Sequence, residues 1–175
     1  MSVSIQGTQI VFNDGSIQYS KPINQSTASL SGTAVDITGI PSWAKRICIT
    51  VNSGTANGSS FFQAQLGTAS GIETTGYACA GSWGGGAYSS TTGLLISVSG
   101  ASSGGAYPVK GSLILFNQSG NVWVGPSGAT TMPGQALGAT FNNHKALAST
   151  LDRVRLTTLN GTDSFSGGAF SVFYE

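Results

Sequence analysis

Charged side chains are scarce in this chain: Asp, Glu, Lys and Arg make up 7% of its 175 residues, whereas about 25% is usual in a soluble domain. There is one histidine, and the net charge is +1. These groups supply most of the proton transfer and nucleophile activation in enzymes. A nearly neutral chain also creates no field that would attract nucleic acid or an anionic membrane. We therefore predict a non-enzymatic protein that has neither nucleic acid nor membrane as a partner.

Long apolar runs are lacking as well. None approaches the roughly 18 residues that a membrane-spanning helix requires, so no such helix is predicted. The first residues, MSVSIQG, contain neither a basic region nor an apolar signal core, and we expect synthesis in a host cytoplasm. Because 39% of the residues are apolar, the chain is expected to fold, as one domain with a short extension.

Cysteine is also rare, with Cys48 and Cys79 as the only two. Nothing in the sequence brings them together, so reduced structural thiols are predicted and their pairing stays open. Together with His144 they lack the spacing of a zinc site, and the chain contains no calcium-binding loop. No metal and no cofactor is therefore predicted.

His144 is the only imidazole that could act as a general base. Asp152 follows eight residues later and serines are abundant, so the residue types of a Ser-His-Asp catalytic triad are present. No Gly-x-Ser-x-Gly stands between a strand and a helix, as a nucleophile elbow requires. We interpret His144 as a loop residue, and a carboxylate pair for glycoside hydrolysis stays as the enzymatic alternative.

Glycine, by contrast, is abundant, with 26 residues, and it punctuates short runs of alternating apolar and polar residues. Ile47, Ile49 and Val51 would share one face of a strand, which is the period-two pattern of a half-buried strand. Residues 113–116 and 153–158 show similar runs, the first dense enough for a central strand. The pattern predicts an all-β fold, an antiparallel β-sandwich that is jelly-roll-like.

Turn chemistry predicts how these strands connect. Asn57-Gly58 and Asn160-Gly161 each separate two β-rich runs and predict tight hairpins. Residues 143–152 are the only helical candidate, and we interpret most of them as a loop that leads into a strand. Three glycine-rich segments are predicted to be long loops around short strands: residues 81–93, 100–111 and 125–138.

The first 25 residues differ from the rest of the chain. Asn13-Asp14-Gly15 is a turn signal between two short β-rich runs and predicts a small hairpin. Such a hairpin is too short to be stable alone, so we expect it to dock onto the body or a neighbouring subunit. The predicted division is an attachment segment, residues 1–25, and a sandwich domain, residues 26–175. The candidate attachment residues are Ile10, Phe12, Asp14, Ile17 and Tyr19.

Four aromatic residues are expected in glycine-rich loops rather than on strand faces: Tyr77, Trp83, Tyr88 and Tyr107. Aromatic rings on polar loops give a large contact area with few side-chain torsions to immobilise. They are the candidate ligand or interface residues. Recognition of a glycan or protein is one interpretation; capping the core or packing at a subunit interface is the other, and we prefer the second.

Three segments frame nearly the whole chain: residues 10–18 (IVFNDGSIQ), 35–47 (VDITGIPSWAKRI) and 151–163 (LDRVRLTTLNGTD), with FSVFYE at the C-terminus. They resemble segments of bacteriophage virion proteins, specifically tail-fibre and head-decoration-type β-domains. The first is similar to the FxDGTxQ element near the start of many phage fibre segments. The resemblance implies a non-enzymatic virion component, commonly a homotrimer, and it supplies no catalytic residues.

We therefore expect a structural protein on the surface of a virion, attached through residues 1–25. It would act as capsid decoration (cement) or as a fibre or fibre-tip module. The shortness of the chain favours the first role, and the aromatic residues favour the second. The expected partners are further copies of the chain and other virion proteins. The alternative function is a host-glycan-binding adhesin, with or without weak glycan-hydrolase activity.

Overall fold

The structure is a computed structural model. It describes the backbone of residues 4–6, 9–12, 14–15, 17–19, 24–98, 100–102, 105–130 and 138–175, and the side chains of residues 12, 14–15, 25–97, 108–130 and 138–175. Every regular element in these ranges is a strand, and the sheets pair antiparallel throughout. No helix long and apolar enough to cross a membrane occurs among the described residues.

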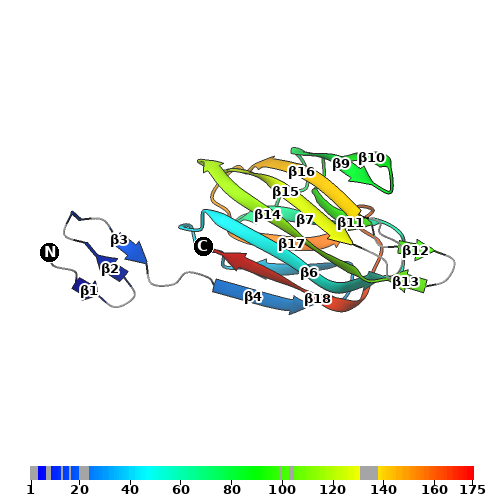
Figure 1. The fold of residues 1–175 in the computed structure, drawn as a ribbon, viewed down its shortest axis with the longest axis horizontal. Coiled ribbons are helices and arrows are strands. Elements are labelled where there is room, and N and C mark those ends of the chain that lie inside the picture. The colour runs from blue at the N-terminus through cyan, green and yellow to red at the C-terminus, as the bar shows by residue number, and fades with distance from the viewer. Residues whose placement is uncertain are drawn as a thin grey trace.

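Two large sheets form the body of the molecule (Figure 1). The eight-stranded sheet has the spatial order β10 (Gly86–Ser90), β9 (Tyr77–Trp83), β16 (Gly138–Ala146), β15 (Val122–Thr130), β14 (Val109–Ser119), β6 (Arg46–Ala56), β18 (Phe165–Tyr174) and β4 (Asn24–Ser29). The five-stranded sheet has the order β11 (Leu94–Val98), β7 (Phe61–Thr68), β17 (Arg153–Thr158) and β5 (Ala34–Thr38), with β8 (Gly71–Ile72) beside β7.

The core lies between these two sheets. Ile47 and Ile49 of β6 are fully buried, as are Phe62 of β7 and Leu156 of β17, and all four belong to one cluster. Side chains of opposite sheets therefore interdigitate, which is the arrangement of a β-sandwich. The predicted all-β sandwich is confirmed, and so is the core face of β6. The finer expectation of a jelly roll stays a prediction.

The predicted long loops are largely strands, which corrects the sequence interpretation. Residues 81–93 contain the end of β9 and all of β10, joined by the two-residue turn Gly84-Gly85, whose φ angles are positive. Residues 125–130 belong to β15, whereas residues 131–137 of the same predicted loop lie outside the described residues. Strand β12 (Gly100–Ser102) pairs with β13 (Gly105–Tyr107). Glycine here permits close packing: a Cβ on Gly125 would lie 1.9 Å from the carbonyl oxygen of Ile114. Gly125 therefore lets β15 pack closely against β14 and does not end the strand.

The two Asn-Gly dipeptides do not form hairpins, contrary to prediction. Asn57-Gly58 leads from β6 in the eight-stranded sheet to β7 in the other sheet, and Asn160-Gly161 leads from β17 back to β18. Strand β6 already pairs with β14 and β18, so it has no free edge for β7. The crossovers bond to each other instead: Asn57 N–H donates to Ser164 O (3.0 Å), and Ser164 N–H donates to Asn57 Oδ1 (2.9 Å).

Asn160 holds the second crossover through its side-chain oxygen, which accepts bonds from Thr162 N–H (3.1 Å) and Asp163 N–H (3.2 Å). Replacing Asn160 with alanine is expected to lower the free energy of unfolding by about 1 kcal/mol, because these turn donors lose their acceptor. The exposed Asn142 of β16 is the matched control, and N142A should change it by less than about 0.5 kcal/mol. Urea denaturation measures the free energy of unfolding of both variants. Equal losses of stability in N160A and N142A would contradict the stabilising role of the Asn160 side chain.

The N-terminal hairpin is formed as predicted. Strand β2 (Gln9–Val11) pairs with β3 (Ile17–Tyr19), and Gly15 N–H donates to Phe12 O (3.0 Å) with Gly15 at a φ of 79°. A third strand, β1 (Ser4–Gln6), pairs with β2. Among the described residues these strands pair only with one another, and Figure 1 shows their sheet beside the sandwich.

Candidate functional site

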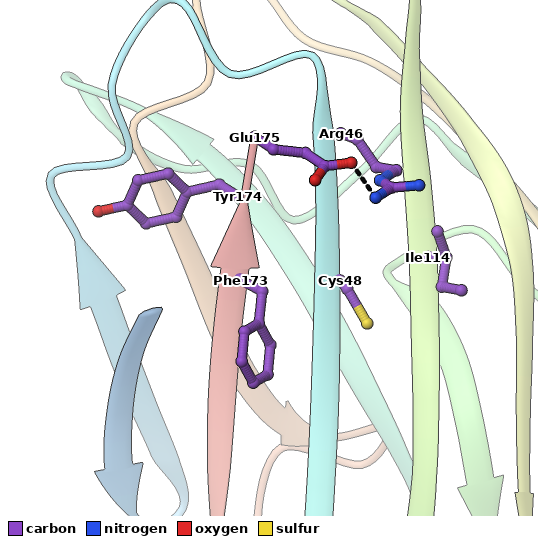
Figure 2. Close-up of a pocket in the computed structure, with 6 residues that line it drawn as sticks. All are labelled: Arg46, Cys48, Ile114, Phe173, Tyr174 and Glu175. Atoms are coloured by element: carbon purple, nitrogen blue, oxygen red, sulfur yellow. Dashed lines mark ion pairs between the residues drawn. The ribbon is translucent and has the colours of Figure 1, made fainter. Parts of the chain in front are cut away.

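The outer face of the eight-stranded sheet carries apolar side chains. Because Ile47, Ile49 and Val172 point into the core, the residues between them face outward. The register aligns Phe173 of β18 with Cys48 of β6, and Cys48 with Ile114 of β14. These three half-buried side chains line a hollow of about 260 Å³ (Figure 2).

A second row runs parallel to the first on the same face. Phe116 of β14 pairs with Arg46 of β6 on one side and with Val124 of β15 on the other, and Val124 pairs with His144 of β16. Phe116 is 46% exposed, which is unusual for a phenylalanine in the centre of a sheet. We call Phe173, Cys48, Ile114, Phe116 and Val124 together the apolar face.

Two charged side chains at the rim of the apolar face neutralise each other. Arg46 forms an ion pair with the carboxylate of Glu175, the last residue (Figure 2). The Glu175 carbonyl also accepts bonds from the N–H groups of Lys45 (2.8 Å) and Arg46 (2.9 Å). Beside this corner Trp43 is 45% exposed, and its ring centroid lies 6.0 Å from that of Tyr174. The corner therefore adds aromatic surface to the apolar face, beside a balanced Arg46–Glu175 pair.

The two cysteines are free thiols, as predicted, and lie on opposite faces of the same sheet. Burial raises the pKa of the Cys48 thiol, although the nearby Arg46 charge opposes this. Burial likewise raises the pKa of Cys79, against a hydrogen bond from Leu95 N–H (3.4 Å). Both thiols therefore stay protonated at neutral pH, which makes them poor nucleophiles and ligands.

The candidate aromatic residues separate into different environments. Trp83 ends β9 and Tyr88 lies within β10, so both are on strands rather than in loops. Their ring centroids are 6.4 Å apart, and Tyr88 lies 4.8 Å from Phe61. Trp83 is half-buried and packs on the small cluster that contains Phe61 and Phe141. The pair thus covers one end of the core.

Tyr77 begins β9 and is 3% exposed, so the expectation of a loop aromatic available to a ligand is wrong for this residue. Its hydroxyl accepts a bond from Leu66 N–H (2.7 Å) and donates to Glu73 O (2.7 Å). Burial is the main cause that raises the Tyr77 pKa; the Leu66 bond opposes it and the Glu73 charge adds to it. The hydroxyl therefore remains protonated and anchors the segment between β8 and β9.

The remaining predicted residues lie in several places. The side chains of Ile10, Ile17, Tyr19 and Tyr107 are outside the described residues, whereas Phe12 and Asp14 are exposed at the hairpin turn. His144 lies exposed in β16 rather than in a loop, and Asp152 forms an ion pair with Arg153 (2.8 Å). Within the described ranges no three His, Cys, Asp or Glu residues gather to hold a metal ion.

Comparison with protein-family models, with curated proteins and with solved structures found no match. The fold and surfaces define the class of the molecule: an antiparallel β-sandwich with an apolar outer sheet face and a separate N-terminal sheet.

Sequence reasoning missed the apolar face, although a signal for it exists. In residues 113–116 and 170–174 apolar residues interrupt the alternation, so that Phe116 and Phe173 fall on positions that are polar in an ordinary outer face. The density of the first run predicts a central strand, which β14 is. The sequence could not show that none of the described residues forms a second layer over these positions.

Proposed function

We propose that this chain is a non-enzymatic structural protein on the surface of a bacteriophage particle, attached through residues 1–25. It would act there as capsid decoration (cement) or as a fibre module. The observation that carries the proposal is the apolar face, where Phe116 is 46% exposed and Phe173, Cys48 and Ile114 are half-buried. Contiguous exposed apolar surface marks interaction sites in soluble proteins, and a face with few charges is readily desolvated on assembly.

The N-terminal sheet supports the attachment role. Strands β1–β3 together span few residues, and so small a sheet is marginal by itself. A partner surface on the particle would stabilise it and cover its edges. The segment resemblance to phage fibre and decoration domains includes this hairpin, in residues 10–18.

We further propose that the apolar face joins copies of the chain into a homotrimer, so that this face is buried within the assembly. Sedimentation of the purified protein should give about three times the monomer mass of 17.7 kDa. Placing a charge on the face by F116K should shift the mass toward the monomer. The control T38K places the same charge on an exposed residue of β5 in the other sheet, and we expect it to leave the assembly intact. A monomer at every concentration of the unmodified protein would contradict the trimer.

Attachment through the hairpin is tested at its turn. Gly15 has a φ of 79°, which side-chain-bearing residues rarely adopt, so G15V should break the hairpin and remove the protein from purified particles. The matched control is G138V, at a position where an added Cβ meets no atom within 4 Å. Immunogold electron microscopy of the particles measures incorporation. Normal labelling with G15V, or no labelling of particles with the unmodified protein, would contradict the proposal.

A further inference from the structure

The outer face of the five-stranded sheet differs in character from the apolar face. It carries a hollow of about 530 Å³. Most of the residues that line it are of polar type, among them Gln63, Gln65, Thr92, Arg155, Thr157 and Asn160. The floor is a grid of polar side chains on two neighbouring strands, because Thr157 pairs with Gln63 and Arg155 pairs with Gln65 across β17 and β7. On both strands these residues alternate with residues of the main core cluster, so the grid faces away from that cluster.

The hollow carries no unbalanced charge. Arg155 donates two bonds to one carboxylate, from Nε to Asp36 Oδ1 (2.7 Å) and from Nη2 to Asp36 Oδ2 (2.9 Å). The Asp36 hydrogen bond is the main cause that raises the Arg155 pKa. A guanidinium bound in this bidentate way is already matched to an anion. An anionic ligand would have to compete with Asp36, so the hollow suits a neutral ligand.

One polar group on the floor lacks a partner. Gln63 is 2% exposed, and its Oε1 atom has no hydrogen-bond donor among the described residues. Its neighbours are engaged: Gln65 Nε2 donates to Thr92 O (2.8 Å), and Thr157 Oγ1 donates to Thr33 O (2.8 Å). A buried unpaired carbonyl is rare and destabilising in native proteins. A ligand that brings a hydroxyl donor into the hollow would remove that penalty.

We propose that this hollow is a binding site for a neutral carbohydrate. Sugar hydroxyls both donate and accept hydrogen bonds, as amide and hydroxyl side chains require. An apolar ligand would leave the amides unpaired, and an acidic one would meet the Asp36 carboxylate. Leu159, 38% exposed at the rim, offers an apolar contact for the C–H face of a sugar ring. The site stands on these residues alone and does not depend on attachment to a particle.

The binding test is affinity electrophoresis of the whole protein in native gels that contain dextran, mannan, galactan or xylan, with alginate as the acidic comparison. At least one neutral polysaccharide should retard the protein, and alginate should not. Failure of all four neutral polymers to retard it would overturn the proposal, and so would retardation by alginate alone. The immunogold experiment on particles is scored separately, so the two proposals fail independently.

The location of the binding site is tested with variants, in gels that contain the polysaccharide that retards the unmodified protein. Q63M keeps the length of the side chain but removes its amide, and A34Y fills the hollow from an exposed position of β5. Each should weaken binding at least tenfold, while the control Q118M on the other sheet should bind normally. Q63M should also leave the thermal midpoint undiminished, since it removes an unpaired buried atom. Undiminished binding by both Q63M and A34Y would overturn the site.

Discussion

Replacing Phe62 with alanine is expected to lower the free energy of unfolding by about 3–5 kcal/mol. Phe62 is fully buried in β7, between the two sheets. Its ring meets that of Phe165 edge to face, with centroids 5.1 Å apart and an interplanar angle of 78°. The variant loses the free energy gained when the ring is transferred out of water. It also loses the packing contacts of the ring, because neighbours on rigid strands cannot collapse fully into the cavity that remains.

The matched control is F116A, which removes the same side chain from the apolar face. Phe116 is 46% exposed, so its removal should change monomer stability by less than about 1 kcal/mol. Urea denaturation at a fixed low protein concentration measures both variants and keeps the contribution of assembly small and constant. Similar losses for F62A and F116A would mean that Phe116 is covered in the folded chain, contrary to the structure.

Replacing Glu73 with glutamine is expected to lower the free energy of unfolding by about 2–3 kcal/mol, because it leaves the charge of Lys145 without its carboxylate. The side chain of Lys145 is only 5% exposed, and its Nζ lies 2.6 Å from Glu73 Oε2. Its remaining partners are neutral: the carbonyl of Thr75 at 3.0 Å and the ring of Tyr77, whose centroid is 5.0 Å away. Removing the other partner, by K145M, should lower the free energy of unfolding less than E73Q does, because Glu73 is 23% exposed and can be hydrated.

This pair also predicts a dependence of stability on pH. Burial, the largest influence, would raise the pKa of Glu73, but hydrogen bonds from Lys145 and Ala148 N–H and the Lys145 charge hold it below the ordinary value of 4.5. A pKa lowered by folding stabilises the protein fully above the unfolded pKa. That stability is lost as the pH falls through the folded pKa. The free energy of unfolding of the unmodified protein should therefore fall as the pH is lowered below about 4.5. The free energy of unfolding of E73Q should fall less over the same pH range.

Urea titrations at pH 7 and at a series of acidic pH values measure both effects. E175Q is the matched control, since it breaks the Arg46–Glu175 pair, whose side chains are 48% and 35% exposed. A pair this exposed contributes about 0–1 kcal/mol to the free energy of unfolding. E175Q should therefore lower that free energy less than E73Q does. Equal losses for E73Q and E175Q, or an unchanged acid dependence in E73Q, would show that the buried pair does not stabilise the fold.

Prediction from sequence succeeded where a local pattern also has a local cause. Ile47, Ile49 and Val51 alternate with polar residues, and alternation by itself decides which face of a strand can be buried. The turn at Asp14-Gly15 formed as expected, because β2 and β3 follow one another closely in the chain and pair directly with each other. The same reasoning failed at Asn57-Gly58 and Asn160-Gly161, where the adjoining strands pair with others far away in the chain.

The candidate surfaces depend even more on distant pairing. Tyr77 and Trp83 stand on one strand, yet one lies in the main core and the other covers its end, because β9 lies near one edge of its sheet. Gln63 and Thr157 are separated by most of the chain and become neighbours only through the pairing of β7 with β17. No spacing in the sequence signals such a pair.

The scarcity of charge, the alternating strands and the glycine content determined by themselves that this chain forms an antiparallel β-sandwich with little conventional catalytic equipment. Alternation fixes only which side chains share a face. Only the tertiary structure decided which faces meet in the core and which remain outside, because the order of strands in each sheet arises from non-local hydrogen bonds. That order left one outer face apolar, with Phe116 and Phe173, and made the other polar, with Gln63 and Thr157.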